Sequence, residues 1–134
     1  MAEKTEQLRE RTFQFAIRIM RLFRSLPASA EARIVGQQLL RSGTSVGANY
    51  RAACKARSRA DFISKLGIVE EEADETVFWL EFLVRTNVMP ERRMHDLIDE
   101  AKQLTAIFAA SRRTARNNRH SELGNRKSVR KKRP

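Results

Sequence analysis

The sequence predicts an all-α protein: an antiparallel up-down bundle of four helices with a disordered basic C-terminal tail. Apolar residues recur at helical spacing through four segments. Only three prolines occur, and Pro27 and Pro90 fall between predicted helices. Short links between amphipathic helices favour antiparallel neighbours. We therefore assign residues 1–111 to the bundle and residues 112–134 to the tail.

The first helix is predicted from about Thr5 to Leu26, where Pro27 ends it. Two apolar rows at 3–4 spacing predict a broad buried face. These rows are Phe13, Ala16, Met20 and Phe23, and Phe15, Ile19, Leu22 and Leu26. The opposite face is strongly basic and includes Arg11, Arg18 and Arg21.

The second helix is predicted from Ala30 to Arg57, with Ser29 as its N-cap. Glycine in a helix interior costs up to about 1 kcal/mol relative to alanine, so the pair Gly43 and Gly47 needs a structural reason. Their spacing lines a strip where another backbone can approach closely. Ser42, Ser45 and Asn49 share an adjacent face. We favour interhelical hydrogen bonds for these three over the alternative, a nucleic-acid contact.

The third helix is predicted to follow Ser58, an N-cap with Asp61 three residues on, and to end near Thr86. A heptad seam marks its buried side: Phe62, Leu66, Val69, Ala73, Thr76, Leu80 and Leu83. Residues 77–84 are apolar almost all round, which predicts a second packing partner. For Trp79 we favour a place in the core or at a subunit interface over base stacking.

The fourth helix is predicted to begin at Pro90 and to run to about Arg113. Its buried stripe is Met94, Leu97, Ile98, Ala101, Leu104, Thr105 and Phe108. From Arg112 onward the apolar periodicity is lost, and Arg, Lys, Asn and Ser dominate. This composition predicts a disordered cationic tail.

Charge is distributed unevenly along the chain, whose formal net charge is +11. Residues 1–59 hold 12 Lys and Arg against 4 Asp and Glu, and residues 60–111 hold 5 against 11. Residues 112–134 hold 10 against 1. The protein therefore consists of a basic half, an acidic half and a basic tail.

Several kinds of chemistry lack support in the sequence, which predicts a protein that is not an enzyme and binds no metal or cofactor. His95 and His120 are not part of Glu-x-x-His pairs, as a di-iron bundle requires. Cys54 is the single cysteine, so no internal disulfide forms, and we favour a small packed residue over a reactive thiol. No segment resembles a membrane span or a signal peptide, and we expect a cytoplasmic protein.

Three stretches carry a family resemblance: residues 38–53, residues 58–66, and residues 72–80 with Trp79. They closely resemble the four-helix-bundle proteins named for open reading frames inside 23S rRNA intervening sequences. The fold is also similar to that of the accessory variability determinant proteins of diversity-generating retroelements. Those are five-membered barrels that bind nucleic acid and a reverse transcriptase. The resemblance implies a homopentamer and RNA or DNA binding, and it supplies no catalytic residues. It does not include the basic tail.

The charge division suggests how subunits would meet. If the basic surface of the first two helices meets the acidic third helix of the next subunit, the contact is heterologous and can close into a ring. Glu71 and Glu75 are the acidic residues assigned to this contact. Ser42, Gly43, Ser45, Gly47, Asn49 and Trp79 complete the predicted structural or interface motif.

The leading functional interpretation is a homo-oligomeric protein that binds RNA or DNA through phosphate contacts of low sequence specificity. The predicted contacts are Arg11, Arg18, Arg21, Arg112, Arg113, Arg116, Arg119, Arg126, Lys127, Arg130, Lys131, Lys132 and Arg133. An alternative is an adaptor ring that docks a reverse transcriptase or another protein. A membrane-surface protein is disfavoured because the tail has little apolar content, and a tail that only solubilises an oligomer is the remaining alternative.

Overall fold

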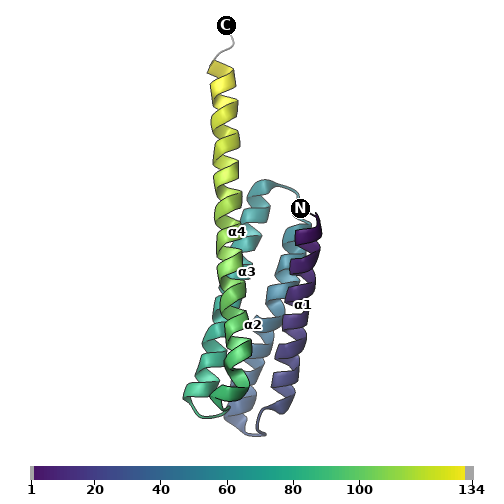
Figure 1. Ribbon diagram of the computed structural model, residues 1–134, viewed down its shortest axis with the longest axis vertical. Coiled ribbons are helices and arrows are strands. Elements are labelled where there is room, and N and C mark those ends of the chain that lie inside the picture. The colour runs from purple at the N-terminus through teal and green to yellow at the C-terminus, as the bar shows by residue number, and fades with distance from the viewer. Residues whose placement is uncertain (1, 132–134) are drawn as a thin grey trace.

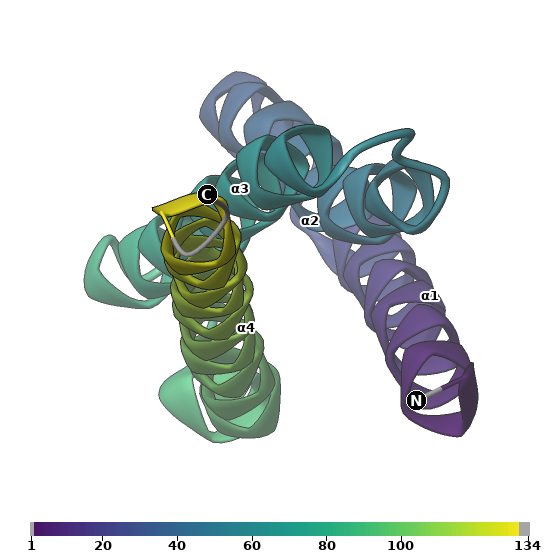
Figure 2. The same cartoon turned by 90° about the horizontal axis from the view of Figure 1, so that it is seen from above.

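The computed structural model describes residues 2–131, which form four consecutive antiparallel helices and no strand (Figure 1). They are α1 (Ala2–Ser25), α2 (Ala30–Cys54), α3 (Arg59–Arg85) and α4 (Glu91–Lys131). Side chains are described for residues 3–121, 123 and 124. Each helix packs extensively on the next along the chain, whereas α1 and α4 diverge when seen from above (Figure 2). The predicted four-helix, all-α fold is confirmed.

Local signals in the sequence set the helix ends. The Ser29 hydroxyl accepts a hydrogen bond from the Ala32 N–H at 3.2 Å, and the Ser58 hydroxyl accepts one from the Asp61 N–H at 3.0 Å, so both predicted caps are confirmed. α2 ends at Cys54 and not at Arg57, because Ser58 takes the extended conformation (φ −146°, ψ 161°) that capping requires. Asn87 has a φ of 62°, which turns the chain between α3 and α4.

The core follows the predicted stripes closely. Six of the seven α3 seam positions are buried: Leu66, Val69, Ala73, Thr76, Leu80 and Leu83. On α4, Met94, Leu97, Ala101, Leu104 and Phe108 are buried. Phe108 meets the ring of Tyr50 on α2, with 5.1 Å between the ring centroids. Together with Phe15, Ile19 and Leu22 of α1, these residues form one apolar core, whose burial is the main driving force for folding.

Glycines of α2 allow α1 to approach closely. A Cβ added at Gly43 would lie 2.7 Å from Ile19 Cγ1, and one at Gly36 would lie 2.7 Å from Leu26 Cδ1. At Gly47 the added atom would lie 3.2 Å from the backbone oxygen of Thr12. The absence of side chains at these positions therefore sets the distance between α1 and α2.

A polar contact is buried between α2 and α3. The Thr76 hydroxyl lies 3.0 Å from the Ser42 hydroxyl, and both residues are fully buried. Ser45 and Asn49 behave differently from the prediction of interhelical bonds. Each donates to a backbone oxygen four residues earlier in α2, at 2.6 and 2.8 Å, because that carbonyl is the nearest acceptor on the helix surface.

One aromatic expectation was wrong, and a second concerns a partner outside this chain. Phe13 was expected in the buried face of α1, yet it is 62% exposed, because α2 contacts the side of α1 that carries Thr12 and Ile19. Phe78 and Phe82 belong to the stretch that was predicted to have a second packing partner. Within this chain they are 55% and 39% exposed, so that partner stays a prediction. The outer side of α3 is therefore apolar and uncovered in the single subunit.

The predicted end of the fourth helix was also wrong. α4 continues to Lys131 and projects beyond the other three helices (Figure 1), so residues 112–131 are helical and not disordered. Loss of apolar periodicity at Arg112 removes packing partners, but Arg, Lys and Ala remain strong helix formers and no proline occurs before Pro134. Ala115, only 6% exposed, continues the packed stripe just past the predicted end near Arg113.

Replacing Gly43 by alanine should lower the free energy of unfolding by about 1–3 kcal/mol, because the added methyl overlaps the branched side chain of Ile19. Gly67→Ala is the matched control. There the nearest atom, Arg112 Cδ, would lie at an ordinary 3.6 Å, so the variant should be about 0.5–1 kcal/mol more stable. Chemical denaturation measures both, and a shift of the same sign in both variants would contradict the close-packing account.

Candidate nucleic-acid interface

Arg11 joins the two helices that diverge. Its guanidinium donates to both carboxylate oxygens of Glu100 on α4, at 2.8 and 2.6 Å, and to Gln103 Oε1 at 2.9 Å. The hydrogen bond and the charge of Glu100 raise the pKa of Arg11, and partial burial opposes this shift. Arg11 was predicted to contact nucleic acid, but here its donors are engaged in fixing α1 against α4.

Arg112 has a similar structural role on the opposite side of α4. Its Nε donates to Glu70 of α3 at 2.8 Å, and Lys102 Nζ lies 3.7 Å from Glu81 of the same helix. These two contacts define the side of α4 that faces α3. Because the helices are antiparallel, α3 begins at a level near residue 123 of α4, and the same side of α4 is uncovered beyond that point.

Three further arginines of α4 are available at this end of the bundle. Arg113 and Arg116 are exposed and Arg119 is partly exposed, and none of them forms an ion pair with a described side chain. The side chains of the predicted contacts Arg126, Lys127, Arg130 and Lys131 lie outside the described set, although their backbone is helical. Lys132 and Arg133 lie outside the described residues altogether.

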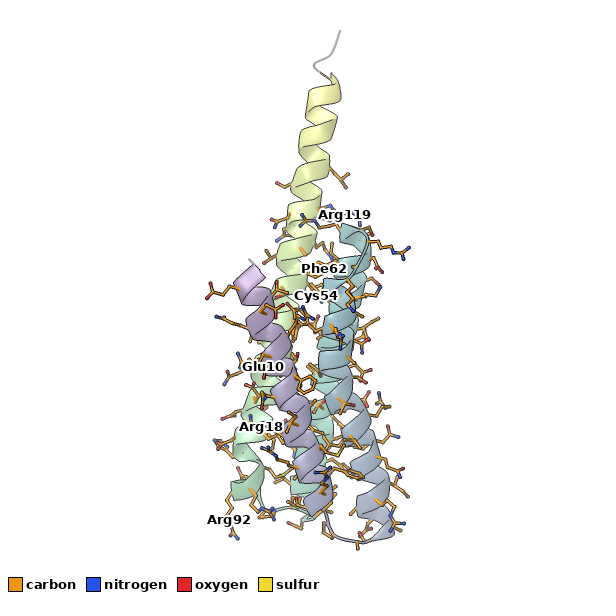
Figure 3. The ribbon with its side chains drawn as sticks, turned by 90° about the vertical axis from the view of Figure 1, so that its right-hand side faces the viewer. Glu10, Arg18, Cys54, Phe62, Arg92 and Arg119 are labelled. Carbon is orange, nitrogen blue, oxygen red and sulfur yellow. The ribbon has the colours of Figure 1, made fainter. Side chains whose placement is uncertain are left out.

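The turn between α2 and α3 adds a second basic group. Lys55, Arg57 and Arg59 are all exposed there, and Arg119 lies about one helical turn before the level at which α3 begins. Figure 3 shows Arg119 at the same end of the bundle as Cys54 and Phe62, opposite Arg92. We define the basic corner as Lys55, Arg57, Arg59, Arg113, Arg116 and Arg119.

Sequence reasoning missed the turn residues of the basic corner as candidate contacts. The alternating spacing of Lys55, Arg57 and Arg59 on both sides of the helix cap Ser58 was the available signal. That a turn and a distant helix meet at one end follows only from the antiparallel packing of α3 and α4.

Arg18 and Arg21, the other predicted contacts, lie along α1. Arg18 is partly exposed and Arg21 exposed, and neither pairs with a described carboxylate. Arg18 lies along α1 away from Arg119 (Figure 3), and Arg21 follows it nearer the C-terminal end of α1, so both are separate from the basic corner. The predicted contacts whose side chains are described therefore fall into three groups. Arg11 and Arg112 form ion pairs within the chain, Arg18 and Arg21 lie on α1, and Arg113, Arg116 and Arg119 lie towards one end of the bundle.

Much of the acidic surface of α3 is neutralised within the subunit. Arg41 of α2 pairs with Glu72 at 3.2 Å and also with Glu75, which accepts a further hydrogen bond from Trp79 Nε1 at 3.0 Å. Glu71 is exposed. Of the two glutamates assigned to a subunit contact, Glu71 therefore has its carboxylate free of described partners.

Tyr50 and Cys54 lie beneath the basic corner. Tyr50 is 5% exposed, and this burial raises its pKa to about 12, with an added contribution from the charge and hydrogen bond of Cys54. Thr5 and Arg9 oppose the shift. Tyr50 is thus a neutral, packed side chain at ordinary pH, and Cys54 is half-buried beside it.

Two further features of the described part of the chain bear on function. Among these residues, no group of three or more His, Cys, Asp and Glu side chains is placed to hold a metal ion. None of the described helices has a stretch long and apolar enough to cross a membrane.

Comparison with known proteins places this architecture. The sequence model of the 23S rRNA-intervening sequence protein family matches residues 4–110. A crystal structure at 1.70 Å of a protein of unknown function from the S23 ribosomal protein family of Bacteroides thetaiotaomicron has a TM-score of 0.76 and 35% sequence identity. The match covers 82% of this chain and 98% of that one. No curated protein matched.

The contact between Arg11 and Glu100 should stabilise the bundle by about 1 kcal/mol of coupling in a double-mutant cycle of Arg11→Met and Glu100→Gln, measured by denaturant unfolding. The pair is partly buried and doubly bonded. The control cycle on Arg9 and Glu6, an exposed pair on α1, should give at most about 0.5 kcal/mol. Additive single effects at Arg11 and Glu100 would show that α1 is held by apolar packing alone.

Proposed function

The chain belongs to the 23S rRNA-intervening sequence protein family, and from this premise we propose that it is a non-enzymatic, cytoplasmic protein that binds RNA or DNA through phosphate contacts. The observation that carries the proposal is the basic corner. It gathers six Lys and Arg side chains from a turn and from α4 at one end of the bundle. Duplex and single-stranded nucleic acids both present closely spaced phosphates to such a surface.

The distribution of ion pairs supports the basic corner over α1 as the main contact. Among the described side chains, the α3 carboxylates that pair with α4 are Glu70, with Arg112, and Glu81, with Lys102. Arg113, Arg116 and Arg119 are left with no described carboxylate to neutralise them. Because phosphate contacts release counterions, the affinity arising here should depend steeply on salt. Such contacts position nucleic acid and carry little base information.

We further propose that the protein acts as a homo-oligomer, a ring of five subunits by its resemblance to related bundles. The uncovered aromatic cluster on α3 supports self-association. Phe78 stacks on Phe82 with 6.0 Å between centroids and meets Trp79 edge-on at 4.9 Å. Several basic corners in one assembly would raise avidity without new contacts. The aromatic cluster equally favours the alternative, an adaptor that docks a reverse transcriptase or another protein.

Replacing Arg113 and Arg116 together by Gln should weaken binding of a 20-nucleotide RNA and a 20-base-pair DNA. The slope of log K against log salt should become shallower by about 2. The double variant Arg18→Gln and Arg21→Gln removes the same charge from α1 and should bind like the wild type. Fluorescence anisotropy over a salt series measures all three proteins.

Two results would contradict this assignment. Weaker binding only in the Arg18 and Arg21 variant would move the contact to α1. No binding by the wild type at 0.1 M salt, a concentration at which exposed charges still interact over about 10 Å, would overturn the nucleic-acid proposal itself.

Replacing Phe78 and Phe82 together by serine should reduce the assembly to smaller species in sedimentation velocity, because the apolar face that drives association is lost. Ile34→Ser is the matched control, since Ile34 is a single apolar side chain on α2 and is 63% exposed. Far-UV circular dichroism should be unchanged in both. A double variant that keeps the wild-type mass would exclude this face from self-association, and a monomeric wild type would favour the adaptor.

A further inference from the structure

Phe78 and Phe82 on one side of the subunit and Phe13 on another mark two uncovered apolar surfaces. On the outer side of α3, Phe78 and Phe82 are 55% and 39% exposed. Phe13 is 62% exposed in a hollow of about 210 Å³ between α1 and α2, which Gly47 lines without a side chain. Figure 2 shows α1 and α3 on different sides of the bundle, so one subunit cannot bring the two surfaces together.

Each surface also carries charge that is not paired within the chain. Arg51 lines the hollow between α1 and α2, is exposed and forms no ion pair with a described side chain. Arg9, the other cation of this hollow, pairs with Glu6 at 2.9 Å. On the outer side of α3, Glu71 and Asp74 are exposed and also lack a described partner. The unpaired charge is therefore positive on one surface and negative on the other, as in complementary interfaces.

Arg51 and Glu71 lie at heights that let them meet between two copies pointing the same way. Ser42 of α2 contacts Thr76 of α3 at 3.0 Å, which fixes the register of these antiparallel helices. Counting from that contact, Arg51 is level with position 67 of α3, about 6 Å along the axis from Glu71. Helical side chains point toward the N-terminus of their own helix, so Arg51 and Glu71 point toward each other's height.

The same direction brings apolar residues together. Gly47 lies beside the Thr12 backbone, which fixes the register of α1 on α2. Counting through both registers, Phe78 is about level with Met20, which is partly exposed. Met20 follows Phe13 by seven residues, so the two lie on one side of α1. The aromatic residues of α3 in one copy can thus contact an apolar row on α1 of another.

Gly67 leaves room for Phe13 of the other copy. Phe13 is about level with Glu71 and points toward the N-terminal end of α1, the end of the bundle at which α3 begins. A hollow of about 470 Å³ lies there beside Gly67, between α3 and α4. A Cβ added at Gly67 would have one neighbour within 4 Å, Arg112 Cδ at 3.6 Å. The surface of α3 therefore offers an opening for an aromatic ring.

We infer that two copies of this chain associate side by side and pointing the same way, with the outer side of α3 of one copy in the groove between α1 and α2 of the next. Arg51 pairs with Glu71 across this contact, and the α3 aromatic residues pack on Met20. Phe13 enters the hollow at Gly67. The inference rests on the proposed homo-oligomer and adds the receiving surface, the direction and the residue pairs. Because the two surfaces differ, the contact is heterologous, and repeating it builds a ring where the rotation closes.

A symmetric contact between two α3 helices is the competing arrangement. It would cover Phe78 and Phe82 of both copies. It would leave Phe13 and Arg51 uncovered, because they lie between α1 and α2, and it would give Glu71 no contact with Arg51. The unlike pairing covers both apolar surfaces and neutralises both kinds of charge, and we therefore favour it.

A charge exchange tests the pairing of Arg51 with Glu71. Arg51→Glu or Glu71→Arg alone should weaken self-association by about tenfold or more, because like charges then face each other. The double variant Arg51→Glu with Glu71→Arg restores opposite charges and should recover the wild-type mass. Arg92→Glu is the control, an exposed reversal at the other end of the bundle (Figure 3), and should assemble like the wild type. Sedimentation velocity of the full-length proteins without nucleic acid, over a concentration series, measures each mass.

Mixing two deficient variants tests whether the contact joins unlike surfaces. Phe13→Glu disables the receiving groove, and Phe78→Ser with Phe82→Ser disables the α3 face, so each variant alone should be monomeric. Their equimolar mixture should form a dimer and nothing larger, because one intact groove meets one intact α3 face. A symmetric contact would instead leave Phe13→Glu assembled and give no mixed dimer. Far-UV circular dichroism should be that of the wild type in both.

The outcomes separate this inference from the proposed function. If the double charge variant stays as small as the single variants, or if Phe13→Glu keeps the wild-type mass, the inference is wrong. Self-association through α3 still holds in that case if the Phe78 and Phe82 variant dissociates. A monomeric wild type would overturn both the inference and the proposed homo-oligomer. Nucleic-acid binding is tested independently of these results by the Arg113 and Arg116 variant.

Discussion

The arrangement of this bundle depends on how closely α1 can approach α2. Gly36, Gly43 and Gly47 leave no side chain where Leu26, Ile19 and the Thr12 backbone sit. With α1 on that side, α2 turns its Ser42 toward Thr76 of α3 and its Arg41 toward Glu72. The small residues of α2 thus fix the packing of α1, and the polar residues next to them fix the packing of α3.

Electrostatics then sort the surface into distinct regions. The acidic residues of α3 pair with basic residues of α2 and α4 along the length of the bundle, as at Glu72 with Arg41 and Glu70 with Arg112. Neutralisation within the subunit leaves Arg113, Arg116 and Arg119 without a described carboxylate partner, towards the end of the bundle that carries the turn between α2 and α3. It also leaves an outer α3 face on which Phe78 and Phe82 are exposed between partly neutralised acids. Two surfaces of different chemistry result, one for anions and one for an apolar partner.

The sequence predicted the parts of this structure that depend on local signals. The heptad seam of α3 and the caps Ser29 and Ser58 are readable because spacing and capping chemistry act within a few residues. The predicted burial of Phe13 was wrong because a broad apolar face does not indicate which of its edges the neighbouring helix covers. The predicted end of α4 was wrong because a helix can continue where its apolar packing stripe ends.

The candidate site was less predictable for a related reason. From the sequence, Arg11 is predicted to be a free surface cation. In the fold it pairs with Glu100 of α4, which is 89 residues away along the chain. Equally, the basic corner joins residues 55–59 to residues 113–119, which only the antiparallel pairing of α3 and α4 brings to the same end of the bundle. The spacing of residues along the chain does not predict ion pairs between distant segments. The sequence therefore identifies the basic residues but does not show which of them form ion pairs in the fold.

The position of the basic corner constrains any ring built from this subunit. In a ring closed about an axis parallel to the helices, every subunit points the same way, so all basic corners and all α4 extensions lie on one face. A perpendicular axis would place them around the rim, where one nucleic acid could not reach them together. The α3 aromatic cluster lies on the side of the bundle and not at its end, which is where a contact between parallel neighbours must form. The two surfaces are therefore compatible in one proposed assembly, in which the side contact would build the ring and the ends would remain open to bind phosphate.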